Sequence, residues 1–174
     1  MAFAGEGKTF LDRMQARLQG WAALTYNEVV DVGEYRRDAL PDFDRYAIIL
    51  DLVSETESSE VSCVNTKRKI WKVNVVALVR KFGALAKYGY TLPNVGICYH
   101  IDQIKDALRF HKFGAPPPGF TSGGYIDVKK RELDGEVVIS SFEGAPSENR
   151  ANFYFEVVIP FVGEGRETYM PAVT

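Results

Sequence analysis

Alternation of side-chain character over residues 69–82 constrains the fold of this chain more than any other feature. One side of the stretch carries Trp71, Val73, Val75, Ala77 and Val79, and the other carries Lys72, Asn74, Val76, Leu78 and Arg80. Period two places successive side chains on opposite faces of a strand, whereas a helix would scatter them. The stretch therefore predicts a long strand. Because both of its sides include apolar residues, both faces need a cover, and we expect a neighbouring subunit to supply part of it.

A second alternating stretch precedes it. In residues 46–53, Tyr46, Ile48, Leu50 and Leu52 face one way, which predicts a strand antiparallel to the long one. Residues 54–60 are Ser, Glu or Thr throughout. This run predicts a solvated loop or the tip of a long hairpin.

The last third of the chain also has strand character. Short alternating stretches cover residues 125–129, 136–142 and 151–162, and a weaker strand signal covers residues 29–35. Pro160 predicts that the 151–162 strand lies at a sheet edge or ends there. Residues 163–174 are expected to form a loose tail.

Two helices are expected on this sheet. Thr9 and Asp12 resemble a capping box, and apolar residues then recur at helical spacing, which predicts an amphipathic helix over residues 9–24. Ile101, Ile104 and Leu108 predict a short helix over residues 101–111, and the prolines at 116–118 prevent its continuation.

These elements define the expected fold class. The pattern predicts an α+β fold: a mainly antiparallel sheet with an N-terminal amphipathic helix and a short second helix packed on it. A length of 174 residues suits one domain, 1–174, with residues 1–8 and 163–174 as flexible tails.

Charge and composition exclude several function classes. The net charge is −2, so no global basic field draws the chain to nucleic acid or anionic lipid. There is no run of ~18 apolar residues and no secretion signal, and two cysteines, Cys63 and Cys98, suit a reducing compartment. We expect a soluble protein of the cytoplasm.

No catalytic constellation is evident. The string Gly5-Glu6-Gly7-Lys8-Thr9 resembles the end of a phosphate-binding loop, but no strand precedes it to hold the backbone amides. His100 and His111 are the only histidines. Cys98 lies two residues before His100, which would place both on one face of an extended chain, although structural roles explain them more simply. We expect no enzyme, no cofactor and no metal site.

Charged residues gather at the ends of the expected hairpin. Lys67, Arg68 and Lys69, close to Trp71, suit phosphate contact and base stacking. Glu55, Glu57 and Glu60 would face them across the hairpin, so cross-strand salt pairing is the simpler interpretation.

The layout resembles the tail terminator proteins of long-tailed bacteriophages over roughly residues 9–162. In that family an N-terminal helix leads to a strand that ends in a polar loop, here Tyr46 to Glu55. A long strand follows, here Ile70 to Lys81, then a helical segment and two closing strands, here Glu136 to Ser141 and Phe153 to Phe161. In this chain the turn-rich residues 83–96 stand where the family has a longer helix closer behind the strand.

The resemblance implies a structural virion protein of the tail or neck, assembled in the host cytoplasm. Such proteins form a hexameric ring that ends tube polymerisation and helps join tail to head. The implied partners are copies of the chain itself, the tail tube protein and head–tail connector proteins, with no membrane and no sequence-specific nucleic acid. Another neck or tail component and a small ligand-binding β-rich module are the alternatives. The candidate contact residues are Glu55, Glu57, Glu60, Lys67, Arg68, Lys69, Glu143, Glu148 and Arg150.

Overall fold

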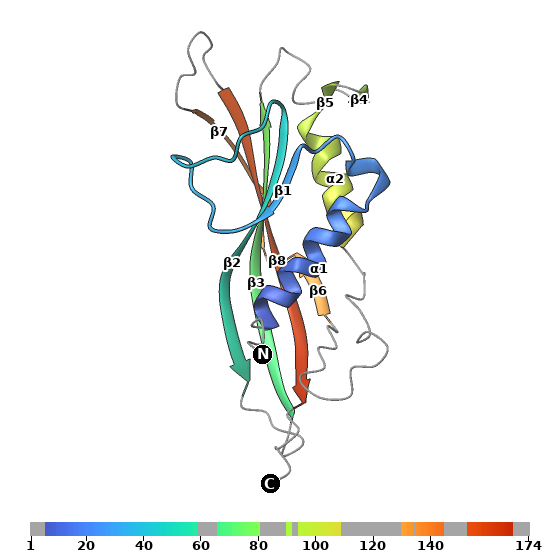
Figure 1. Ribbon diagram of the computed structural model, residues 1–174, viewed down its shortest axis with the longest axis vertical. Helices are drawn as coiled ribbons and strands as arrows, with labels where there is room; N and C mark the ends of the chain where they lie inside the picture. Colours follow the sequence, from blue (N-terminus) through green and yellow to red (C-terminus); the bar gives the residue numbers. More distant parts are fainter. Residues whose placement is uncertain are drawn as a thin grey trace.

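The chain folds as an α+β protein with two α-helices on one face of a mainly antiparallel sheet (Figure 1). The computed structural model describes residues 6–58, 66–80, 90–91, 94–108, 130–133, 135–144 and 153–168. In chain order the elements are α1 (Glu6–Gln19), η1 (Ala22–Leu24), β1 (Val29–Val32), β2 (Tyr46–Ser58), β3 (Thr66–Arg80), β4 (Tyr90–Thr91), β5 (Asn94–Val95), α2 (Ile97–Leu108), β6 (Lys130–Leu133), β7 (Val138–Glu143) and β8 (Phe153–Thr168).

The main sheet has the order β1-β2-β3-β8, and β6 and β7 both pair with the outer edge of β8. β2 and β3 form the predicted antiparallel pair, with Ile48 opposite Ala77. β1 confirms the weak strand signal near residue 29, but it pairs with β2 in parallel. β4 and β5 form a separate two-stranded sheet.

Helices α1 and α2 cover one face of the sheet and build the main core there. Phe10, Met14 and Leu18 of α1 are buried against β2, β3 and β8, and the buried stripe of α2 begins at Ile97. The Arg17 Nε donates to the carbonyl of Ala107 at 3.0 Å, so α1 also satisfies the C-terminal end of α2. Burial of this face accounts for the strict alternation in β3.

The opposite face is covered by residues 33–45, the connection from β1 to β2, which we call the strap. Figure 1 shows the sheet nearly edge-on, with the helices on one side and the strap on the other. A second, smaller cluster lies under the strap: Ala47, Ile49, Val76 and Leu78 are buried, and Tyr35, Leu40 and Phe43 of the strap pack on them. The chain thus covers the centre of this face itself, where we expected a neighbouring subunit.

The polar run after residue 53 is a strand and not a loop. β2 continues to Ser58, past a bulge between Leu52 and Ser54 that adds one residue relative to β3. The prediction of a loop over 54–60 is therefore wrong through Ser58, and residues 59–60 lie outside the described residues. Pairing with β3 satisfies the backbone here, so the strand needs no apolar pattern of its own.

Strand β8 is internal to the sheet, contrary to the prediction from Pro160. It pairs with β3 over its full length and with β6 and β7 on its other side. β6 ends at Leu133 opposite Phe161, and β7 begins at Val138 opposite Val158, so Pro160 lies level with the break between them. A missing N–H is tolerated at such a break. Gly135 adopts φ 126° there and faces the Pro160 ring.

The expected tails and helix bounds need correction. Residues 163–168 belong to β8 and residues 6–8 belong to α1, so neither stretch is a loose tail. α1 ends at Gln19, and residues 22–24 form the separate η1, because Gly20 is a poor helix former. The second helix begins at Ile97 and not at residue 101; it is described as far as Leu108, and residues 109–111 lie outside the described residues. The strand predicted over 125–129 lies outside the described residues.

Candidate interaction surfaces

Three of the predicted contact residues come together on the helix-covered face. The Lys69 Nζ lies 3.3 Å from Glu55 Oε1 and 3.6 Å from Glu57 Oε1, and the Trp71 Nε1 donates to Glu55 Oε2 at 2.7 Å. These ion pairs confirm the cross-strand salt pairing. Lys69 is only 9% exposed, so this lysine is part of the structure and not an open contact.

The first turn of α1 packs directly on this cluster. A Cβ on Gly7 would lie 2.9 Å from Glu55 Oε2 and 3.4 Å from Trp71 Nε1. Gly7 therefore permits a close approach of helix to sheet, which explains a glycine that resembled part of a phosphate loop.

The other predicted contact residues are spread over the fold. Lys67 and Arg68 lie on β3, which continues beyond the start of α1, and Glu143 is exposed at the end of β7 opposite Phe153. Glu60, Glu148 and Arg150 lie outside the described residues. Among the described residues, Glu143 therefore lies apart from the group on β2 and β3.

A carboxylate that sequence reasoning missed holds the strap to the sheet. Glu156 of β8 accepts two hydrogen bonds from Arg37, at 2.8 Å from Nε and 2.9 Å from Nη2. The hydroxyls of Tyr35 and Ser140 also donate to it. The Arg37 hydrogen bonds hold the pKa of Glu156 below its usual value. We call Tyr35, Arg37, Ser140 and Glu156 the latch; its sequence signal is one glutamate within the apolar run 153–161.

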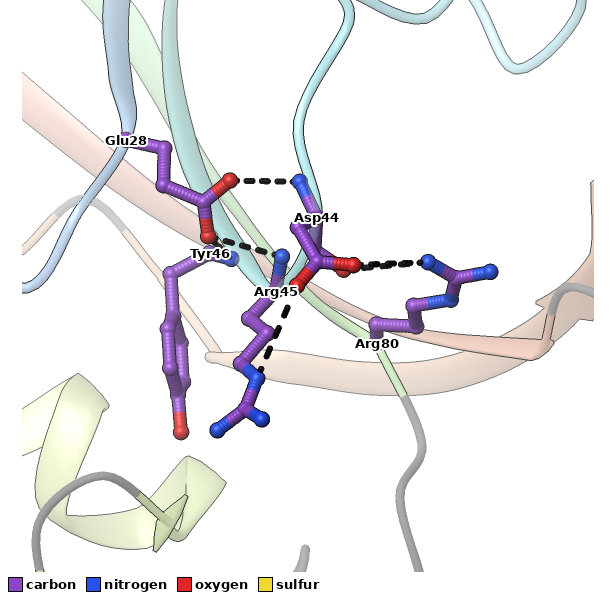
Figure 2. A network of polar contacts seen from close by, with 5 residues as sticks. All are labelled: Glu28, Asp44, Arg45, Tyr46 and Arg80. Atoms are coloured by element: carbon purple, nitrogen blue, oxygen red, sulfur yellow. Dashed lines mark hydrogen bonds and ion pairs between the residues drawn. The ribbon is translucent and has the colours of Figure 1, made fainter.

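Glu28 fixes the end of the strap, as Figure 2 shows. Its carboxylate accepts hydrogen bonds from the backbone N–H groups of Asp44, Arg45 and Tyr46, the last two at 2.8 and 3.3 Å. The Asp44 carboxylate in turn lies 3.1 Å from Arg80 Nη1, which joins the strap to the end of β3. Asp44 thus has a structural role.

His100 is a buried structural residue. Its Nδ1 lies 2.7 Å from the Tyr26 hydroxyl, and the ring contacts Tyr26 and Tyr46. Burial lowers the pKa of His100 to about 3. Cys98 and His100 both lie in α2, so the expectation of an extended chain is wrong, and two residues apart on a helix they do not share a face.

An apolar surface remains exposed at the β7 edge of the sheet. Val138 is 51% exposed, Ile139 43% and Phe153 44%, and β7 is hydrogen-bonded to a described strand only on its β8 side. The opposite edge differs, because the Gln15 Nε2 donates to the carbonyl of Val30 in β1 at 2.6 Å. Val138 and Ile139 point to opposite faces of the sheet at this edge, and Phe153 of β8 lies at the far end of β7, opposite Glu143; we call the three the edge surface. Exposed apolar side chains on an open edge strand are typical of a protein contact.

The described residues offer neither a metal site nor a membrane-spanning helix. They contain no group of three or more His, Cys, Asp or Glu side chains placed to hold a metal ion. Among the same residues, no helix has the length and apolar character needed to cross a membrane.

Comparison with known proteins leaves the family open. No known family model matches the sequence, and no curated relative aligns with it significantly.

Proposed function

We propose that this protein is a structural component of a phage tail. It forms a ring at the end of the tail tube, stops tube polymerisation and helps join the tail to the head. The observation that carries this proposal is the edge surface, an open strand with apolar side chains about half exposed. That the assembly is a ring at the end of a tail tube is inferred from the layout that the chain shares with tail terminator proteins.

The two edges of the sheet support ring formation. A closed ring requires contact between two different patches of neighbouring copies, whereas one patch that contacts itself gives a two-fold dimer. β1 has a carbonyl occupied by the Gln15 side chain, while β7 presents Val138 and Ile139. Unlike edges favour a head-to-tail contact.

The long strands offer a separate surface for the tube or connector. β2, β3 and β8 continue past the row of Trp71 and Gly163, where α1 begins, to Ser58, Thr66 and Thr168 (Figure 1). A three-stranded extension beyond the helices can reach a partner while the edge surface contacts the next copy.

Purified cognate tail tubes provide the test. Protein is mixed with tubes, and tube ends are imaged by negative stain, with tube elongation followed in parallel. The proposal predicts rings at one tube end and an arrest of elongation. A protein that binds neither tube end and leaves elongation unchanged would contradict it.

Lysine substitutions connect this result to the edge surface. The double variant Val138→Lys/Ile139→Lys should fold normally and lose ring formation, because a charge in the contact must be desolvated. Val53→Lys is the matched control, since Val53 is 56% exposed on the β2 bulge, away from β7. Equal ring formation by both variants would show that the edge surface is not the contact.

A further inference from the structure

The strap covers the second face of the sheet without becoming part of the core. None of residues 33–45 is fully buried, and Tyr35, Leu40 and Phe43 are only partly buried. The strand residues beneath them are fully buried, among them Val76 and Leu78. Removal of the strap would therefore expose these buried apolar residues of the sheet.

The attachment of the strap is concentrated at its ends and at the latch. At one end of the strap, the Gly33 N–H donates to the carbonyl of Leu50 at 3.0 Å. At the other end, the Glu28 carboxylate accepts hydrogen bonds from the backbone N–H groups of residues 44–46. The Tyr35 N–H also donates to Asp51 at 3.3 Å. Within the described part of the chain, no backbone hydrogen bond joins residues 36–43 to the sheet. Arg37 holds this middle part through the latch, and its side chain is 53% exposed.

An apolar row runs from the edge surface to the region under the strap. Val138 lies opposite Val158, Val158 opposite Val76, and Val76 opposite Ile49, so four strands contribute to one row on this face. Val138 is half exposed at one end, while Val76 and Ile49 are buried. Lifting the strap would join the covered residues to the exposed edge in a continuous apolar surface.

The outer side of the strap is charged. Glu34, Arg36, Asp38 and Asp42 are all exposed there. A second copy that approached the closed strap would have to desolvate these groups, which is unfavourable without matched partners. The closed strap therefore opposes docking on this face, and the uncovered row favours it.

We propose that the strap is an autoinhibitory cover, and that a second copy of the chain docks on the apolar row when the latch opens. This inference rests on the self-assembly in the proposed function and adds its control. The second copy is the occupant because the row is continuous with the edge surface that joins subunits. The free protein then stays largely unassembled, and latch opening accompanies ring growth.

Two neighbouring arginines allow a matched test. Arg37→Ala removes the latch contacts, whereas Arg36→Ala removes only the exposed pair with Asp38, at 2.7 Å. Glu156→Gln weakens the latch from the sheet side. Hydrogen exchange is measured for two hydrogen-bonded amides of the strap, those of Tyr35 and Ala39, and, as an internal reference, for those of residues 73–79 in β3. Light scattering gives the mass over a series of protein concentrations.

Arg37→Ala should raise exchange at the Tyr35 and Ala39 amides at least about tenfold, because charge-assisted hydrogen bonds that hold the strap are lost. Exchange in β3 should not change. Self-association should begin at a protein concentration at least about tenfold lower than for the wild type, by the same free-energy difference. Glu156→Gln should act in the same direction, and Arg36→Ala should match the wild type.

Three results would overturn the inference. The strap amides could stay protected in Arg37→Ala, the strap and β3 amides could lose protection together, or the strap could open with no change in mass. Failure of the wild-type protein to form rings on tail tubes would count against the proposed function, whereas latch variants that leave the strap closed or the onset of self-association unchanged would count against this inference alone.

Discussion

Gly163 and Phe10 meet where α1 crosses β8, and their contact depends on the missing side chain. Gly163 lies opposite Trp71, and the rings of Phe10 and Trp71 are stacked with centroids 5.2 Å apart. A Cβ on Gly163 would lie only 2.3 Å from Phe10 Cζ. Glycine in this strand marks the close approach of a helix and not the start of a tail.

Gly163→Ala should therefore destabilise the protein. Overpacking of a core contact costs about 1–3 kcal/mol of unfolding free energy, measurable by urea denaturation. Gly33→Ala is the matched control, because nothing lies within 4 Å of a Cβ there, and it should change stability by less than about 0.5 kcal/mol. Equal effects at the two glycines would contradict the packing of Phe10.

His100 predicts a pH dependence of stability. Its pKa is about 3 in the folded protein against 6.5 ordinarily, because burial disfavours the charged ring. Between these values the unfolded chain binds a proton that the folded protein does not. The unfolding free energy that neutral His100 contributes is therefore complete above pH 6.5. It is lost as pH falls toward 3, at up to about 1.4 kcal/mol per pH unit.

The measurement is urea denaturation from pH 7 to pH 4.5 for the wild type and His100→Phe. Phenylalanine keeps ring contacts with Tyr26 and Tyr46 and removes the titration. The variant should lose less stability than the wild type as pH falls, by an amount equivalent to about one proton. Parallel curves would show that His100 is not buried in its neutral form.

At the level of elements, the Glu28 clamp ties the strap to the start of β2. Three backbone N–H groups share its carboxylate, much as a capping side chain serves the orphan donors of a helix. Glu28→Ala should lower the unfolding free energy by about 0.5–2 kcal/mol. Glu34, like Glu28, is exposed, and it lies on the strap itself. Glu34→Ala should have little effect on the unfolding free energy. A negligible loss in Glu28→Ala would mean that water replaces the clamp.

Elements with one buried face could be predicted from the sequence, and their ends could not. β3 and the first half of β2 show period two because the helices cover one face. The second half of β2 is polar and is held by pairing with β3, so no pattern marked it. The start of α2 was expected at Ile101 because the helical repeat of Ile101, Ile104 and Leu108 begins there, although the buried stripe starts at Ile97 and includes His100.

The candidate site depended on contacts that one sequence does not reveal. The pairing of Glu55 with Lys69 followed from the expected hairpin, because both flank one turn. The latch joins Arg37 to Glu156 across a long stretch of chain, and no local spacing indicates such a pair. The edge surface depends on strand order, which places β7 outermost.

At the scale of the whole molecule, the helices close one face of the sheet, the strap covers the other, and the β7 edge is open. The closed face carries the core. We propose that the edge surface joins copies and that the strap limits that contact until assembly. A net charge of −2 leaves no long-range field to drive association, so short-range apolar contact must provide specificity.

Imaging of cognate tail tubes after addition of the purified protein tests the central claim most directly. Negative stain, with light scattering of the same sample, should show closed rings at one end of each tube and no further elongation. A protein that stays monomeric at every concentration, leaves both tube ends bare and allows elongation to continue would contradict the account.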